Sequence, residues 1–289
     1  MTGKAVVKGR MMPTTTKGWT VAGTAVVALL LTAACGPGAG GEAGVDPAAV
    51  SDTPPQPQLL LTFDDQQPGP AAGRELHGDG AAAATIDLLS VNKPTTTFER
   101  GRDGGIALRL PAYSGTQKGS FAALRVEPEE WLSPGASEFT FGADIRLDGH
   151  SGGSTVDDGD NVLQRGLFAD SAQFKIQVDK HRASCVVRGT DGAVTAKSKL
   201  ALDPARWYRL ACRRLDNTVT LTVADLAAGT APAEVTKTGP IGSLDMIGSE
   251  PLAIGAKIGE DGEIIRSSTD QFNGRIDNVS YLRSDRPAG

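Results

Sequence analysis

The pattern that most resembles a catalytic motif is a short glycine-rich segment. Residues 149–153 read Gly-His-Ser-Gly-Gly and match G-x-S-x-G, the turn that presents a nucleophilic serine between a strand and a helix in α/β-hydrolases. A strand-like segment precedes it, but residues 154–160 have turn composition and no helical period, and His181 is the one histidine downstream. Since the pattern lacks the helix that would support an oxyanion hole, we interpret the segment as a loop at a sheet edge.

Carboxylates could supply a site for a hard cation. Asp277 alternates with apolar residues, so its side chain is expected to point inward or to a sheet rim, where a buried carboxylate needs a partner. That partner could be Ca²⁺, with Asp64 or Asp65 and backbone carbonyls completing the ligands, or it could be backbone N–H donors, which we favour. A second acidic cluster, residues 157–161, lacks EF-hand spacing and is expected to be solvated. No motif requires a cofactor, so structural Ca²⁺ is the one candidate.

Exposed aromatic rings would be platforms on which sugar rings stack. The chain has few tryptophan and tyrosine residues, three of each. Trp131 and Tyr113 stand next to loop-like segments and are therefore the candidate ligand-binding residues. Packing against the core is the alternative for each ring.

The first 35 residues have the features of an export signal. Four basic residues precede an apolar run of 14 residues, which is shorter than the roughly 20 that a spanning helix needs. Ala33-Ala34-Cys35 resembles the lipobox of bacterial lipoproteins, in which the cysteine is acylated and the signal is cleaved. The resemblance implies a signal peptide over 1–34 and an exported protein that lipidated Cys35 holds to the extracytoplasmic face of a bilayer. An uncleaved anchor and an ordinary signal peptide are the alternatives.

Residues 35–58 follow as a Gly- and Pro-rich segment that is expected to be a flexible tether. Cleavage after residue 34 would change the formal net charge from −5 to −9, because that segment carries four positive charges and no negative ones. An acidic chain lacks the basic surface that nucleic-acid phosphates require, so no nucleic-acid partner is expected. Residues 36–41 match G-x-G-x-x-G but lack the flanking strand and helix, so no nucleotide site is expected.

Cys185 and Cys212 remain as an even pair once Cys35 is assigned to lipid. Neither has a neighbouring histidine or the C-x-x-C spacing of redox thiols. In an exported chain such a pair is expected to form a disulfide, either across neighbouring strands or between two sheets.

Alternating apolar and polar residues recur through residues 59–285 without a sustained helical period. The clearest segments are 139–147, 174–179 and 218–223, and residues 162–168 form a further candidate strand. Turn pairs such as Asp148-Gly149 and Asp216-Asn217 separate them. About a dozen short strands predict one all-β domain over 59–285, built as two packed antiparallel sheets in a sandwich or jelly roll, before a short tail at 286–289.

The order of the strands resembles that of laminin-G-like and concanavalin A-like lectin/glucanase domains. Residues 137–145 resemble their early core strand, residues 207–211 carry their W-(H/Y)-x-(V/L)-A pattern, and residues 272–279 carry their closing F-x-G-x-I-D-x-V pattern. The resemblance implies a jelly roll whose relatives bind glycans or proteins, sometimes with Ca²⁺, and only sometimes hydrolyse anything.

Enzymatic relatives that cleave glucans carry E-x-D-x-E on one strand, and this chain has no such run. We therefore expect a binding module that recognises a glycan or a cell-surface protein through loops or a sheet face, and no enzyme. The alternatives are a glycan-active hydrolase or lyase and a structural envelope lipoprotein without a small ligand.

Overall fold

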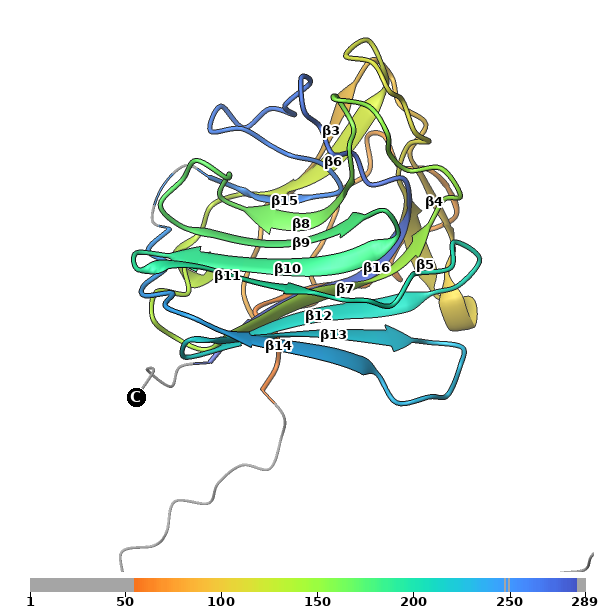
Figure 1. The fold of residues 1–289 in the computed structure, drawn as a ribbon. Coiled ribbons are helices and arrows are strands. Elements are labelled where there is room, and N and C mark those ends of the chain that lie inside the picture. The colour runs from red at the N-terminus through yellow and green to blue at the C-terminus, as the bar shows by residue number, and fades with distance from the viewer. Residues whose placement is uncertain (1–54, 247, 249, 285–289) are drawn as a thin grey trace, which may run out of the picture. The chain divides into compact units, whose positions relative to one another are not determined.

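Two antiparallel β-sheets face each other as a sandwich (Figure 1). They belong to a computed structural model that describes residues 55–246, 248 and 250–284. The predicted signal peptide, Cys35, the tether up to residue 54 and the predicted tail lie outside the described residues. The prediction of an all-β sandwich of two antiparallel sheets is confirmed.

One sheet has nine strands and the other has seven. In order across the nine-stranded sheet lie β14 (Ala233–Thr238), β13 (Thr218–Asp225), β12 (Tyr208–Leu215), β7 (Phe139–Leu147), β16 (Gly274–Arg283), β5 (Ile106–Arg109), β4 (Thr97–Arg100) and β2 (Gly69–Pro70), and β1 (Leu59–Leu61) also pairs with β16. The seven-stranded sheet consists of β11 (Gly192–Lys197), β10 (Arg182–Gly189), β9 (Gln173–Asp179), β8 (Asp160–Arg165), β15 (Leu252–Ile254), β6 (Phe121–Val126) and β3 (Ile86–Val91).

Helical structure is confined, within the described ranges, to two short 3₁₀ helices, η1 (Arg102–Gly104) and η2 (Glu130–Leu132). In this part of the chain, no helix has the length and apolar character needed to cross a membrane.

Aromatic rings from both sheets meet in the core. The alternation Phe139-Thr140-Phe141 turns both phenylalanines of β7 inward, where they are almost fully buried. Phe141 packs against Phe174 of β9 with 4.9 Å between ring centroids, and Phe174 lies 5.7 Å from Tyr281 of β16. These contacts join the two sheets, because Phe174 belongs to one and its two partners belong to the other.

A disulfide also links the sheets. Cys185 of β10 is bonded to Cys212 of β12, and their Cα atoms are 6.1 Å apart. The predicted bridge is confirmed, and it is the inter-sheet alternative because β10 and β12 belong to different sheets. Both cysteines are completely buried.

The two ends of the described domain are hydrogen-bonded to each other. The side chain of Gln58 donates to the backbone carbonyl of Arg283 at 3.1 Å and accepts from the Arg283 N–H at 2.7 Å. Directly after Gln58, β1 pairs with β16 from Leu59 opposite Tyr281 to Leu61 opposite Val279. The last described residues of the predicted tether, 55–58, thus lead directly into the sheet.

Residues 255–273, which connect β15 to β16, cover part of the outer face of the seven-stranded sheet. They do so through a small apolar cluster separate from the main core. Its members are Phe121, Ala123, Val156, Ala253, Ala256, Ile258 and Ile264. The cluster lies over β6 and β15, so this connection covers one half of the outer face and forms a wall beside the other half.

Candidate functional site

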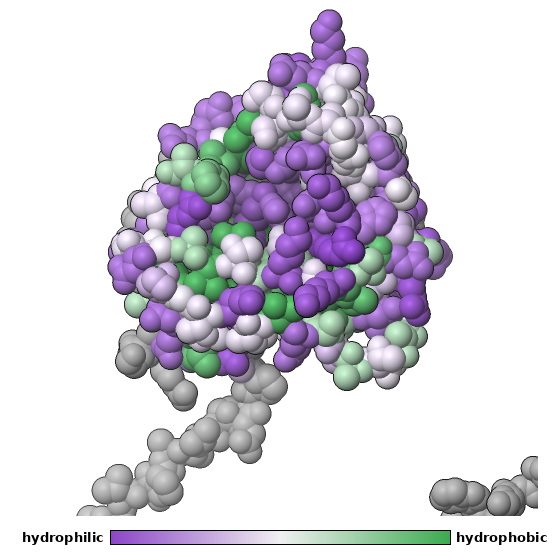
Figure 2. Space-filling view, in the orientation of Figure 1, coloured by the Kyte–Doolittle hydropathy of each residue, from purple (hydrophilic) through white to green (hydrophobic). Residues whose placement is uncertain are grey.

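The uncovered half of the outer face holds a groove of about 570 Å³. Its floor comes from β8, β9, β10 and β11, and its wall comes from the connection over residues 257–270. Figure 2 shows that hydrophilic residues predominate on the surface seen in the orientation of Figure 1, with small apolar patches among them. This concave surface, which combines polar and apolar side chains, is the candidate functional site.

The pairing register aligns one side chain from each strand of the floor in a row across the sheet. Gln164 of β8 lies opposite Lys175 of β9. Lys175 lies opposite Val186 of β10, and Val186 lies opposite Thr195 of β11, so three of the four side chains are polar. On β9 the polar residues alternate with Phe174, Ile176 and Val178, which point into the core. Period-two alternation thus gives one strand an apolar inner face and a polar outer face.

Two lysines, one on the floor and one on the wall of the groove, share one carboxylate. Lys257 Nζ lies 2.6 Å from Asp270 Oδ2 and donates to Ser268 Oγ at 2.9 Å. Lys175 Nζ lies 3.5 Å from the same Asp270 oxygen. Burial lowers the pKa of Lys175 to about 8, despite the opposing effect of Asp270.

An exposed aromatic ring stands at the rim of the groove. Phe168 is 82% exposed, far more than the next most exposed large apolar residue of the described part, Leu200 at 40%. The Arg188 guanidinium carbon lies 4.7 Å from the centroid of the Phe168 ring, and Arg188 Nη1 donates to the Phe168 backbone carbonyl. The ring is therefore held at the rim by a cation–π contact and a hydrogen bond.

A glycine shapes the turn that carries this ring. Gly166 follows β8 with φ of +75°, and a Cβ atom there would lie 2.2 Å from the Ala172 carbonyl oxygen. The Gly166 carbonyl accepts hydrogen bonds from the side-chain amides of Gln164 and Gln173, at 2.6 and 3.1 Å. The floor of the groove therefore holds the turn that presents Phe168.

Sequence reasoning missed Phe168 as a site residue. It placed residues 162–168 in one strand, whereas β8 ends at Arg165. Gly166, followed by Asp170-Ser171, carries the turn signal that could have ended the strand earlier.

The two predicted ligand-binding aromatics do not line the groove. Trp131 lies in η2, is half-buried and packs 6.1 Å from the ring of Tyr281. Tyr113 makes an edge-on contact with His150, with 4.2 Å between ring centroids. The structure thus places both rings in packing contacts.

The three predicted metal ligands each have another partner. Asp277 accepts from the Asn278 N–H at 2.7 Å, and Asp64 accepts from the Ile106 N–H at 2.8 Å. Asp65 accepts from the side chain of the adjacent Gln66. Burial raises the pKa of Asp277 to about 7. The described residues contain no group of three or more His, Cys, Asp or Glu side chains placed to hold a metal ion.

The G-x-S-x-G segment is an irregular loop, as interpreted from the sequence. Residues 148–159 form no helix or strand, so Ser151 lacks the strand-to-helix turn of a nucleophile. Ser151 is buried and hydrogen-bonds to the carboxyl group of Asp160, which also accepts from the Asn273 N–H at 3.0 Å. The cavity next to this loop has a volume of about 160 Å³, much smaller than the groove.

The prediction that residues 157–161 are solvated is wrong. Asp157 and Asn161 are fully buried and Asp160 is 2% exposed, while Asp158 is exposed. Residues 269–273 cover them, and the Val156 carbonyl accepts from both the N–H and the hydroxyl of Thr269. Burial and the nearby Asp270 raise the pKa of Asp157 to about 8. The backbone N–H of Gln271 acts on the Asp157 carboxylate and lowers its pKa, but this effect is outweighed.

No protein-family model matches the chain, and no curated protein is significantly similar to it. Among solved structures, the binding domain of Paraclostridial Mosquitocidal Protein 1 matches 79% of this chain with a TM-score of 0.52 and 11% identity. The LG1-3 region of the laminin alpha2 chain matches 55% with a TM-score of 0.41 and 9% identity. The binding domain of botulinum neurotoxin serotype G matches 80% with a TM-score of 0.43 and 8% identity.

These likenesses concern the fold. The chain spans about half the length of the mosquitocidal and botulinum binding domains, 49% of each, and 32% of the laminin region. The two-sheet sandwich expected from the strand order is confirmed at the level of the fold. A shared fold does not by itself determine a function.

Proposed function

We propose that this laminin-G-like sandwich is a binding module and that its ligand is a glycan that lies in the groove of the seven-stranded sheet. The observation that carries the proposal is the exposed Phe168 ring beside a floor of amide, hydroxyl and ammonium groups. Sugars offer an apolar ring face together with many hydroxyl groups, so a ring platform next to hydrogen-bonding side chains suits them.

A glycan-active enzyme is the rival function. Glycoside hydrolysis ordinarily requires two carboxyl groups about 5–9 Å apart across the scissile bond. Of the described residues that line the groove, Asp270 is the one with a carboxylate, and two lysines already share it. This arrangement favours binding over hydrolysis.

The substitution Phe168→Ala in the full chain is expected to weaken glycan binding about tenfold, because stacking on one ring contributes of the order of 1.4 kcal/mol. A glycan array would identify the ligand, and calorimetry on the best hit would give the two dissociation constants. Leu215→Ala is the matched control, because Leu215 is an exposed apolar residue of β12, in the other sheet. Equal affinities for wild type and Phe168→Ala would contradict the placement of the ligand in the groove.

We also propose that acylated Cys35 anchors the module to the outer leaflet of the cell membrane. The support is the Ala33-Ala34-Cys35 pattern after an apolar run. Cys35→Ser is expected to abolish incorporation of labelled palmitate and to move the protein from the membrane to the soluble fraction, since two or three acyl chains are needed for stable anchoring. Retention of label by Cys35→Ser would show that another residue is modified.

A further inference from the structure

The groove is positively charged, although the chain is acidic. The formal net charge of the chain is −5, yet three basic side chains line the groove, Lys175, Arg188 and Lys257, against one carboxylate, that of Asp270. A local excess of positive charge in an acidic protein steers and selects ligands of the opposite sign.

Two of the positive charges lie where the floor meets the wall and are only partly balanced. Lys175 and Lys257 both face Asp270 Oδ2, and a single carboxylate neutralises one ammonium group. The Lys175 side chain is 8% exposed and that of Lys257 is 21% exposed, so water screens the remaining charge poorly.

The third positive charge lies at the rim. The Arg188 guanidinium contacts the ring and carbonyl of Phe168, and it forms no ion pair with any described carboxylate. Asp170, in the same turn, directs its carboxylate to the Leu167 N–H and does not line the groove. The charge of Arg188 is therefore available to a ligand that contacts the Phe168 ring.

The buried acid Asp157 does not cancel the positive charge of the two lysines at neutral pH. Asp157 lies close enough to Asp270 and Lys257 to interact with both electrostatically. Burial raises its pKa to about 8, so it is protonated and uncharged at pH 7.

We propose that the ligand is an acidic glycan, whose carboxylate or sulfate groups meet Lys175, Lys257 and Arg188 while a sugar ring stacks on Phe168. The inference rests on the proposed function and adds the chemical class of the ligand. Carboxylates and sulfates share the oxyanion that accepts charge-assisted hydrogen bonds from ammonium and guanidinium groups.

The test compares three probes in calorimetry with the full chain: polygalacturonate, the same polymer with its carboxyl groups reduced to alcohols, and a sulfated polygalactan. Wild type is expected to bind at least one acidic probe at least tenfold more tightly than the reduced polymer, and the preferred probe distinguishes carboxylate from sulfate. Lys175→Gln combined with Lys257→Gln is expected to weaken that binding by tenfold to a hundredfold.

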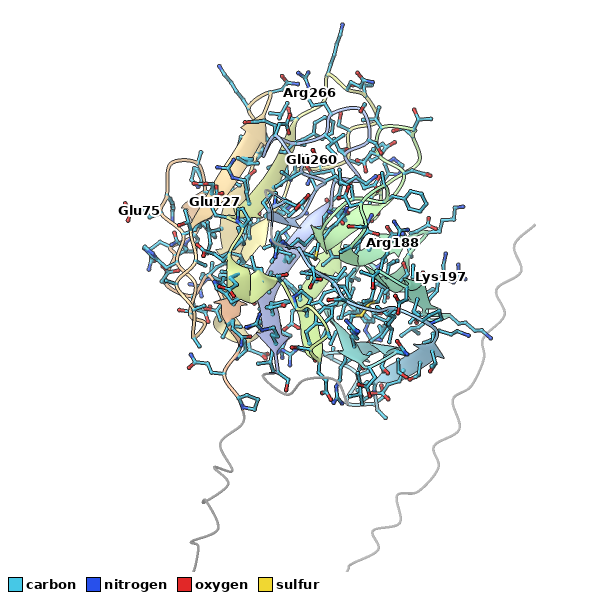
Figure 3. The ribbon with its side chains drawn as sticks, turned by 90° about the vertical axis from the view of Figure 1, so that its left-hand side faces the viewer. Glu75, Glu127, Arg188, Lys197, Glu260 and Arg266 are labelled. Carbon is cyan, nitrogen blue, oxygen red and sulfur yellow. A yellow bond between two sulfur atoms is a disulfide. The ribbon has the colours of Figure 1, made fainter. Side chains whose placement is uncertain are left out.

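Two further variants keep the result interpretable. Arg188→Gln alters a side chain that is not part of the buried pair, so it tests the charge even where the double variant folds poorly. Because Arg188 also holds the Phe168 ring, the effect of charge is read from binding that falls about tenfold for the acidic probe and stays unchanged for the reduced polymer. Lys197→Gln is the matched control: Lys197 lies on β11 on the same side of the molecule as Arg188 (Figure 3), outside the groove, and pairs with Asp179 at 3.4 Å. Its removal is expected to leave the affinity unchanged.

The outcomes separate the two proposals. If wild type binds the reduced polymer as tightly as the acidic ones and Phe168→Ala weakens that binding, the inference of an acidic ligand fails and the groove remains the site. If Lys197→Gln weakens binding as much as Arg188→Gln, the polyanion is held by general surface charge and the inference is again overturned. If no glycan binds on the array or in solution, the proposed function fails together with the inference.

Discussion

Replacing Cys185 and Cys212 together with alanine is expected to lower the free energy of unfolding by about 3.5 kcal/mol and the melting temperature by roughly 7–14 °C. The disulfide joins positions 27 residues apart and lies between the two sheets. Without the bond, the unfolded chain regains the conformational freedom of that loop, and the folded sandwich loses the disulfide cross-link between its two sheets.

Calorimetry and denaturant titration of the full chain would measure this effect. The control is wild type that has been unfolded and refolded with a reductant, because it keeps both side chains and lacks the bond. Reduced wild type is expected to show most of the decrease in the free energy of unfolding. The further decrease in the double variant is due to the missing sulfur atoms at two buried positions. If reduced and oxidised wild type melt at the same temperature, the cross-link does not stabilise the fold.

Asp157→Asn is expected to raise the free energy of unfolding by up to about 4 kcal/mol at pH 7 and to change it little near pH 4. The folded protein keeps a proton on Asp157 up to a pKa of about 8, whereas the unfolded chain releases it near the ordinary value of 3.8. Between these values the folded state binds more protons, so the stability of wild type falls as the pH rises and stays low above pH 8. Asparagine cannot ionise, so the stability of the variant does not fall with rising pH for this reason. Its buried amide, which needs acceptors, makes the stated gain an upper limit.

Denaturant unfolding at several pH values from 4 to 9 gives the difference in the free energy of unfolding between variant and wild type. The contributions of the other buried acids are the same in both proteins and cancel in this difference. Asp158→Asn is the matched control, because Asp158 is the exposed neighbour and its loss is expected to change stability by less than about 0.5 kcal/mol. The opposite result, a less stable Asp157→Asn together with a wild type that a chelator destabilises, would mean that Asp157 holds a cation.

The strands were predictable because each carries its own pattern. In β7 and β13 every second side chain is buried in the core, and this alternation is visible in the residues themselves. The disulfide was predictable as a pair, but its inter-sheet geometry depends on which strands face each other across the sandwich. A strand pattern does not contain that information.

The groove was not predictable, because its parts are distant in the sequence. Lys175 and Asp270 meet only when the connection between β15 and β16 folds back over the sheet. The same connection buries Asp157, which local composition places in solvent. β8 shows the difficulty most clearly: all six of its residues are buried, although its Gln164 lines the groove. Period-two alternation cannot say which outer face a distant segment will cover.

The hydrogen bonds between Gln58 and Arg283 determine how the domain bears mechanical load. A pull on the chain before residue 55 reaches β1 and those two hydrogen bonds first, and from there it passes into β16. Because β16 is an interior strand that pairs with β7 along most of its length, tension that passes through β1 and Gln58 is delivered to the middle of the nine-stranded sheet.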